Sequence, residues 1–345
     1  MRLWRTFERR HECRRCTQEC VRHGEISAAV ALMKRELSLV GAIAALLAAL
    51  AVLAPGFFAA DNIRDMVLSN TPVLLIAVGM TLVILTGEID ISVGSQFAIA
   101  SIAAALFAKA GLPMIVVAIG AAALGWLMGA LNGAMVAFVR IPSIVVTLAT
   151  MVILRDSLRW SRGGAWVQNL PRTFQWFGFS QAGGQLLIVV LGGLVFAKFA
   201  VVLRWIAAGR AIYATGSDGE AARLAGIDIR LVRFHVFAAL GALTGFAALL
   251  NSTRFEDIQA NSGVGLELKV ISAVVIGGAS VSGGRGTLLG TLLGVVLLGA
   301  IGPALTFLGV NAYWEKAIQG AIILAAVAVD AIGGRKGVHA KAAAH

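Results

Sequence analysis

Charged residues are scarce in this chain: they make up 14% of its 345 residues, whereas a soluble domain carries about 25%. Hydrophobic residues account for 59% of the sequence, which excludes an ordinary water-soluble protein. The apolar residues form continuous runs of about 17–25 residues, the length of a membrane-spanning helix, and they do not alternate as the strands of a barrel do. The composition therefore predicts an all-α, polytopic membrane protein.

Sequence motifs of catalysis and nucleotide binding are also missing. The chain has no G-x-x-x-x-G-K-[ST] phosphate loop, no H-E-x-x-H and no G-x-S-x-G, and its five histidines are scattered. The glycine-rich stretch Ser282–Thr287 lacks the lysine of a phosphate loop. We therefore predict a transport component that has no enzymatic activity and no cofactor of its own. An intramembrane enzyme is a disfavoured alternative.

Cysteine is rare, and all three cysteines, Cys13, Cys16 and Cys20, lie in the basic first 36 residues. Together with nearby histidines they are candidate ligands of a small metal site, but a reduced, solvated tail in the cytoplasm is the preferred interpretation. A second alternative is that translation starts at Met33, directly before the first apolar run. No cleavable signal peptide is evident.

About ten apolar segments are expected to span the membrane. Their predicted bounds are 37–53, 66–86, 91–108, 112–139, 144–154, 186–203, 234–250, 268–279, 287–308 and 314–329. Basic residues gather before the first segment, in 204–233 and after residue 333, so the positive-inside rule places both termini in the cytoplasm. The same rule explains the net charge of +11 without a nucleic-acid partner. The interval 155–184, with four arginines, fits least well, and nine or eleven spans are alternatives.

Two acids, Glu88 and Asp90, interrupt the longest apolar region, in the sequence G-E-I-D-I-S-V-G-S over residues 87–95. A charge at mid-bilayer costs at least about 2.5–3.5 kcal/mol, so such a residue faces a cavity, a partner or the interface. Asp90 is expected to cap the helix that follows it. The functional alternative is a polar turn lining the path of a polyhydroxylated solute. The candidate residues of this translocation path or gate are Glu88, Asp90, Ser92, Gly94, Ser95, Asn132 and Glu267.

Glycines at four-residue spacing predict two helix faces that allow backbones to touch. The preferred interpretation is helix packing, and a subunit contact is the alternative. The two sets are Gly125, Gly129 and Gly133, and Gly286, Gly290 and Gly294.

The longest basic loop contains a predicted short helix. Ser217 and Glu220 have the spacing of a capping box, residues 220–225 are good helix formers, and Gly226 is expected to end the helix. A short helix held between two spans offers a soluble motor a place to grip. The alternative is a helix that lies among lipid headgroups.

Four segments, in the same order, resemble the permeases of ribose-type ABC importers: residues 79–95, 141–150, 209–227 and 263–290. The resemblance extends from about Leu37 to Asp330. It implies a transmembrane permease domain over 37–330, between a basic tail at 1–36 and a second cytoplasmic tail at 331–345. Two departures are Glu88, where many members have a small or polar residue, and Ala225, where serine is common.

The resemblance implies a multi-pass protein of the bacterial cell inner membrane that moves a monosaccharide. It further implies a cytoplasmic double-cassette ATPase that binds the ATP, a periplasmic sugar-binding protein, and a second permease copy or paralogue. Residues 87–95 favour rhamnose weakly; ribose, xylose and autoinducer-2 remain open. An ion-coupled secondary transporter of a small polar solute is the alternative. The ATPase-coupling residues implied by the resemblance are Gly209, Arg210, Tyr213, Gly216, Glu220, Ala221, Arg223 and Gly226.

Overall fold

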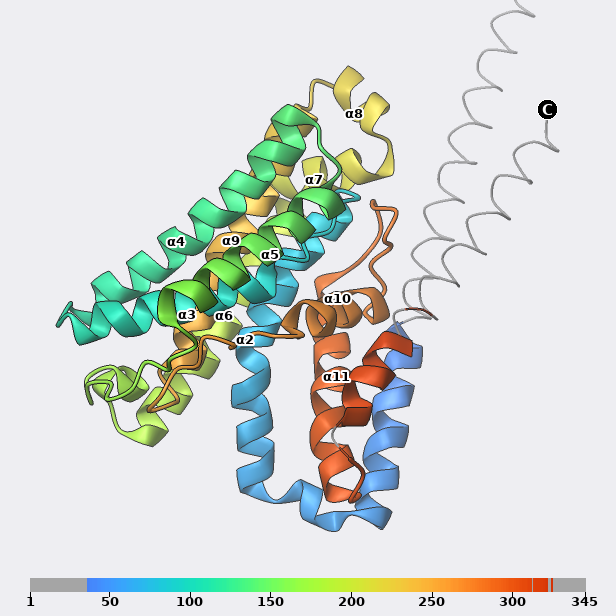
Figure 1. Ribbon diagram of the computed structural model, residues 1–345. Helices are drawn as coiled ribbons and strands as arrows, with labels where there is room; N and C mark the ends of the chain where they lie inside the picture. The colour runs from blue at the N-terminus through green and yellow to red at the C-terminus, as the bar shows by residue number, and fades with distance from the viewer. Residues whose placement is uncertain (1–35, 312, 322–323, 325–345) are drawn as a thin grey trace, which may run out of the picture.

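The computed structural model describes residues 36–311, 313–321 and 324 (Figure 1). Cys13, Cys16 and Cys20 lie outside these residues, as does the 331–345 tail. The described part of the chain is helical, with one isolated β-bridge between Val167 and Ile258. The prediction of an all-α fold is confirmed for this part of the chain.

Most connections between the helices are short, and the longer ones are 163–174, 253–265 and 277–287. In chain order the helices are a helix at Glu36–Leu53, the 3-10 helix η1 (Pro55–Phe58), α2 (Ala60–Leu85), α3 (Val93–Lys109), α4 (Met114–Ala134), the π-helix η2 (Met135–Val139), α5 (Ser143–Arg162), the 3-10 helix η3 (Gln175–Gly178), α6 (Gln181–Trp205), α7 (Ala207–Ser217), α8 (Gly219–Leu224), α9 (Ile229–Ser252), α10 (Leu266–Ile276), α11 (Leu288–Phe307) and helical residues 313–321.

Six helices among the described residues are long and apolar enough to cross a membrane, which makes this a multi-pass membrane protein. They are Glu36–Leu53, Ala60–Leu85, Met114–Val139, Gln181–Trp205, Ile229–Ser252 and Leu288–Phe307. Helix α3 is apolar but shorter, and α10 has only 11 residues. Helix α5 continues beyond the predicted end at Leu154 and carries charged residues in its second half. The total of ten spans therefore stays a prediction.

Helix α2 is the centre of the bundle. In its most apolar part 78% of the residues are buried, and it packs against α6, α9, α10 and α11 (Figure 1). Pro72 lies inside α2 and is tolerated there, because neighbouring helices cover the backbone. From Thr71 to its end α2 is buried on nearly all sides, which explains why this part of the helix is apolar all round and shows no one-sided stripe. The last turn of α2 lies close to α7, at the end of the bundle that carries α8 (Figure 1).

The predicted glycine face of α4 packs against α9. A Cβ atom on Gly125 would overlap the carbonyl oxygen of Gly241, and one on Gly129 would overlap that of Phe237. The two backbones are therefore in direct contact, as the small-residue spacing predicted. These contacts hold α4 and α9 together over several turns.

The second glycine face is only partly as predicted. Gly290 and Gly294 of α11 contact the backbone of α10 at Gly277 and Ala273. Gly286 is not on this face: it precedes α11 and has a φ of +151°, which no other residue type adopts easily. The spacing predicted a third helical turn where Thr287 instead begins the helix as its N-cap, accepting from the amide of Gly290 at 3.0 Å.

Candidate functional site

The polar break between α2 and α3 is a buried hydrogen-bond cluster around Asp90. One carboxylate oxygen of Asp90 accepts from the amide and the hydroxyl of Ser92, at 2.8 and 2.6 Å. The other accepts from the side-chain amides of Gln96 and Asn132, both at 3.3 Å. Thr150 of α5 in turn donates to Asn132 at 2.8 Å. The cluster therefore ties the break to α3, α4 and α5.

Asp90 does not cap α3 in the way the sequence predicted. The N-cap is Ser92, whose side chain makes no capping hydrogen bond, and Asp90 instead binds the amide two residues ahead of it. This is the local bond of an Asx turn, which competes with helix capping for the same short carboxylate. Asp90, Ser92 and Asn132 have no exposed surface in the described part of the chain. Ser95 is also buried and donates to the carbonyl of Met151 at 2.9 Å.

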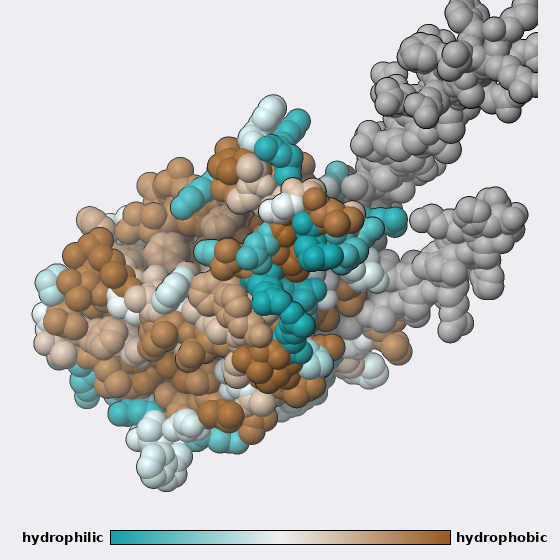
Figure 2. All heavy atoms as spheres, turned by 90° about the horizontal axis from the view of Figure 1, so that it is seen from above, coloured by the Kyte–Doolittle hydropathy of each residue, from teal (hydrophilic) through white to brown (hydrophobic). Residues whose placement is uncertain are grey.

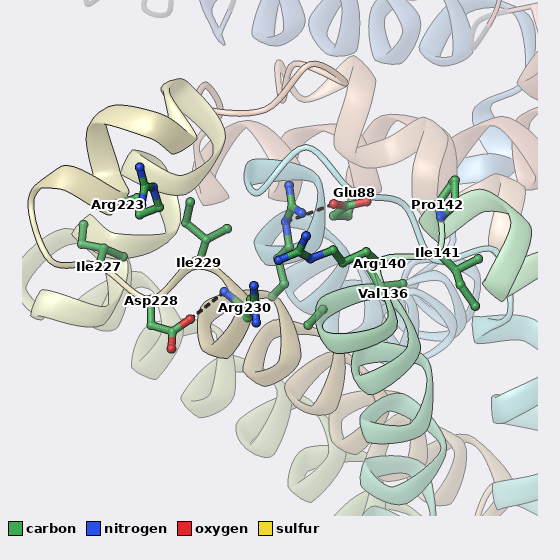
Figure 3. A pocket seen from close by; sticks show the side chains of 12 residues that line it. Glu88, Val136, Arg140, Ile141, Pro142, Arg223, Ile227, Asp228, Ile229 and Arg230 are labelled. Atoms are coloured by element: carbon green, nitrogen blue, oxygen red, sulfur yellow. Dashed lines mark hydrogen bonds and ion pairs between the residues drawn. The ribbon is translucent and has the colours of Figure 1, made fainter.

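Glu88 lies at the edge of this cluster and faces a cavity. Its carboxylate lies 3.1 Å from the guanidinium of Arg233 near the start of α9. The cavity measures about 600 Å³ and opens between η2, α8 and α9 (Figure 3). Arg140, Arg223 and Arg230 line it as well, so it is strongly basic (Figure 3).

Glu267, in the first turn of α10, lies against Gly94, in the first turn of α3. The Glu267 carboxylate lies 3.6 Å from the guanidinium of Arg155 on α5, and a Cβ on Gly94 would overlap that carboxylate. Both side chains are largely covered, so the pair joins the first turn of α10 to α5 across α3. The sequence pointed to Glu267 but did not reveal its partner, because Arg155 lies more than a hundred residues away in a polar interval.

Helices α7 and α8 form the compact unit that the sequence predicted as the coupling segment. Asp218 is the N-cap of α8 and accepts from the amide of Ala221 at 3.0 Å. Ser217, which was the predicted N-cap, is the last residue of α7, and its hydroxyl donates to the carbonyl of Tyr213 at 2.8 Å. Gly226 follows the end of α8 with a φ of +82°, as expected for a helix stop.

Gly216 joins this unit to the end of α2. A Cβ atom on Gly216 would overlap the carbonyl oxygen of Leu85, and that same oxygen accepts from the amide of Gly284 at 2.9 Å. Tyr213 donates its hydroxyl to the carbonyl of Gly286 at 2.8 Å. Helix α7 thus contacts both the end of α2 and the 277–287 connection at backbone distance.

Burial raises the pKa of Tyr213 above its ordinary value of 10.0, because the charged phenolate is poorly solvated there. The hydroxyl therefore stays protonated and remains a donor at every physiological pH. Its partner carbonyl on Gly286 carried no sequence signal, since a backbone group shows none.

Most of the other predicted coupling residues lie on the outside of the unit, whereas Gly209 is buried. Glu220 and Arg223 pair with each other at 2.6 Å on the exposed side of α8. Arg210 approaches the carbonyl of Trp205 at 3.5 Å, and Gly209 is packed against the last turn of α6. The structure therefore brings Tyr213 and Gly216 into contact with the bundle and leaves Glu220 and Arg223 accessible.

A second cavity of about 320 Å³ lies between α2, α10 and the residues after 313. It combines polar side chains with apolar ones. Lys269 lies 4.0 Å from Glu315, which also accepts from Gln319 at 3.0 Å. No sequence motif marks this cavity, because its polar residues are single and belong to distant segments. Its polar lining is Ser69, Asn251, Lys269, Glu315, Lys316 and Gln319.

Helices long and apolar enough to span a membrane, polar cavities and a helix pair outside the bundle are the features expected of a membrane transport permease. The family model described as "Branched-chain amino acid transport system / permease component" matches residues 62–327. This is more than half of the chain, and the chain belongs to this family. No solved structure matches this chain.

Several curated proteins are similar along most of their length. The ribose import permease protein RbsC of Escherichia coli (strain K12) is 35% identical over 294 residues, which cover 84% of this chain and 91% of RbsC. The autoinducer 2 import system permease protein LsrC of Enterobacter sp. (strain 638) is 34% identical, with 87% of each chain covered. The L-arabinose ABC transporter permease protein AraH of Azospirillum brasilense is 35% identical, over 83% of this chain and 84% of AraH.

These similarities confirm the resemblance to permeases of ribose-type sugar ABC importers. The relatives are permease components and not enzymes, and this chain is likewise a transport component. Membership of the family implies an ATPase and a periplasmic binding protein as partners.

Proposed function

We propose that this chain carries a small, hydroxyl-rich sugar across the bacterial inner membrane and is driven by a separate double-cassette ATPase that binds α7 and α8. The relatives named for ribose, autoinducer 2 and arabinose support a cargo of this size and polarity. Rhamnose, ribose, xylose and autoinducer-2 are the candidate cargoes, and rhamnose has no support among these relatives. The second permease subunit is a copy of this chain or a paralogue.

The observation that carries the proposal is the backbone contact between Gly216 and Leu85. Packed backbones transmit displacement, because there is no flexible side chain between them to absorb it. A force applied to α8 from outside therefore reaches the end of α2 and, through the residues that follow, the Glu88–Asp90 break. Accessible residues such as Glu220 and Arg223 provide the surface for the ATPase.

The charge distribution supports the orientation in which α8 faces the cytoplasm. Seen from the α8 end, hydrophilic side chains gather in a strip that is surrounded by hydrophobic ones (Figure 2). Arg140, Arg223, Arg230 and Arg233 meet at this end of the bundle, as the positive-inside rule expects of a cytoplasmic face. Six of the ten predicted spans precede α8 and four follow it, so both termini lie on the same side of the membrane as α8.

For the sugar path we propose the 320 Å³ cavity, with the 86–95 break as its gate. A volume of this size suits a small ligand, and amide, ammonium and carboxylate groups beside the ring of Phe97 suit a polyhydroxylated one. Asp90, Ser92, Gly94, Ser95, Asn132 and Glu267 then hold the gate in place from within the bundle. Glu88 is the member of the set that faces open space.

Uptake by cells that express the chain with its ATPase and binding protein tests the proposal. Labelled ribose, arabinose, rhamnose, xylose and autoinducer-2 are offered separately, and at least one should accumulate. Uptake should persist when the proton gradient is dissipated and ATP is maintained. Uptake that stops with the gradient and continues without the ATPase would instead identify an ion-coupled secondary transporter.

A further inference from the structure

The basic cavity beside Glu88 contains more positive than negative charge. Four arginines line it, Arg140, Arg223, Arg230 and Arg233, against the two acids Glu88 and Asp228. Both acids already have partners: Glu88 pairs with Arg233 at 3.1 Å, and Asp228 accepts from the backbone amides of Arg230 and Leu231 at 3.0 and 3.2 Å. The protein thus leaves a surplus of guanidinium groups around one space.

Two of these guanidinium groups are unused. In the part of the chain that the structure describes, neither Arg140 nor Arg230 has a side-chain hydrogen bond or an ion pair with an acid. The four arginines that line the cavity come from three parts of the chain: Arg140 follows η2 and Arg223 lies on α8 (Figure 3), whereas Arg230 and Arg233 both lie on α9. Like charges gathered from separate elements repel one another unless an anion lies between them.

Arg140 is the C-cap of the π-helix η2. Its φ is +64°, a left-handed conformation that is uncommon for residues other than glycine. A glycine would adopt it more easily, yet the chain has a long cationic side chain at the rim of the cavity. This left-handed turn ends η2, since the backbone amide of Arg140 donates to the carbonyl of Met135, and it leaves Arg140 among the residues that line the cavity.

Taken together, the geometry points to a binding site for the phosphate ester of a small polyol, lined by Arg140, Arg230 and Arg233. Guanidinium groups match phosphate oxygens with paired hydrogen bonds, more specifically than an ammonium group does. A cavity of about 600 Å³ has room for a phosphate together with the polyol to which it is bound. Two sources share this chemistry: the headgroup of phosphatidylglycerol and a soluble sugar or glycerol phosphate.

Glu88 connects this site to the gate. The Glu88 carboxylate is paired with the guanidinium group of Arg233, to which a phosphate would also bind. The carboxylate and the phosphate therefore compete for Arg233. A bound phosphate ester releases Glu88 and with it the residues next to Asp90. Removal of the Glu88 charge should therefore strengthen phosphate binding, whereas removal of an arginine should weaken it.

The test uses the full-length chain in nanodiscs. One arm titrates glycerol 3-phosphate into phosphatidylcholine nanodiscs and measures the heat of binding. The other compares the unfolding midpoint in phosphatidylcholine with the midpoint in phosphatidylglycerol. Each arm is repeated with Arg140→Gln, Arg230→Gln, Glu88→Gln and, as a matched control at the same end of the bundle, Arg204→Gln.

Saturable binding of glycerol 3-phosphate identifies a soluble ester, and stabilisation by phosphatidylglycerol alone identifies the lipid; either supports the site. In the responding arm, Arg140→Gln and Arg230→Gln should each lower the affinity or the lipid effect by about tenfold, Arg204→Gln should leave it unchanged, and Glu88→Gln should raise it several-fold. The site is overturned if neither arm responds, if Arg204→Gln lowers the response as much as the cavity variants do, or if Glu88→Gln weakens it. Because Glu88→Gln predicts a gain, misfolding cannot imitate the expected result.

Discussion

The α-carbon of Gly216 lies against the carbonyl group of Leu85 so closely that a methyl group does not fit between them. This contact joins α7, outside the bundle, to the last residue of the central helix α2. It gives α7 and α8, the proposed coupling segment, a direct backbone connection to the polar break that follows α2.

Gly216→Val should therefore abolish coupling. The added side chain overlaps Leu85 and Gly284 and pushes α7 away from the bundle, so sugar uptake should fall by about tenfold or more while the ATPase still hydrolyses ATP. The measurement is uptake per ATP hydrolysed in proteoliposomes. Gly219→Ala is the matched control, because a Cβ there makes only an ordinary contact with Ile229 at 3.4 Å. Normal coupling in Gly216→Val would show that α7 does not transmit the motion.

Tyr213→Phe tests the second contact of α7. The change removes the 2.8 Å hydrogen bond to Gly286 and nothing else, so we expect a loss of about 0.5–1.5 kcal/mol in stability and a lower coupling ratio. Because the pKa of Tyr213 is raised, the folded protein favours the neutral hydroxyl. The difference in stability between the unsubstituted protein and Tyr213→Phe should therefore be constant below pH 10.0 and should shrink as the pH rises further. Thermal unfolding between pH 7 and about 11 measures it. A difference that shrinks on acidification would contradict the assignment.

Asp90→Asn tests the hydrogen-bond cluster at the break. All the groups that contact the Asp90 carboxylate are donors, so the amide nitrogen of asparagine must face at least one of them. We expect a loss of about 1–3 kcal/mol, seen as a lower unfolding midpoint in detergent. Asp156→Asn is the control, since that side chain is 64% exposed and, among the residues that the structure describes, its ion pair is with Arg159. Equal decreases of the unfolding midpoint in the two variants would mean that the buried cluster does not stabilise the protein more than an exposed ion pair does.

Gly129→Val should disrupt the packing of α4 on α9. The new side chain overlaps Phe237 and Gly241, and backbone cannot move aside as a flexible side chain can. We expect poor expression and a lower unfolding midpoint in whatever protein is recovered. Gly193→Val on α6 is the control, because nothing lies within 4 Å of a Cβ there. If Gly193→Val were equally harmful, the close contact between α4 and α9 would not be the cause.

The sequence was most informative where a residue type has one physical meaning. Continuous apolar runs predicted the helices, and glycines at four-residue spacing predicted the α4–α9 contact. It was least informative where the partner is a backbone group or a distant side chain. Leu85, Gly286 and Arg233 contact the proposed coupling and gate residues only because the bundle brings together the ends of α2, α9 and the 277–287 connection.

The two capping errors have a common cause. Ser217 and Asp90 each have a short polar side chain near a helix start, and each finds a closer partner than the predicted one. Ser217 donates to Tyr213 one turn back, and Asp90 accepts from Ser92 two residues ahead. Local alternatives of this kind compete with capping, and the sequence does not reveal which will prevail.

The most direct test of the account is sugar accumulation in liposomes that contain this chain and a binding protein, with and without the cassette ATPase. We predict no accumulation without the ATPase, and ATP-dependent accumulation when it is present. Accumulation by the chain in the absence of any cassette ATPase would contradict the central claim that motion of α7 and α8, driven from outside the membrane, opens the path.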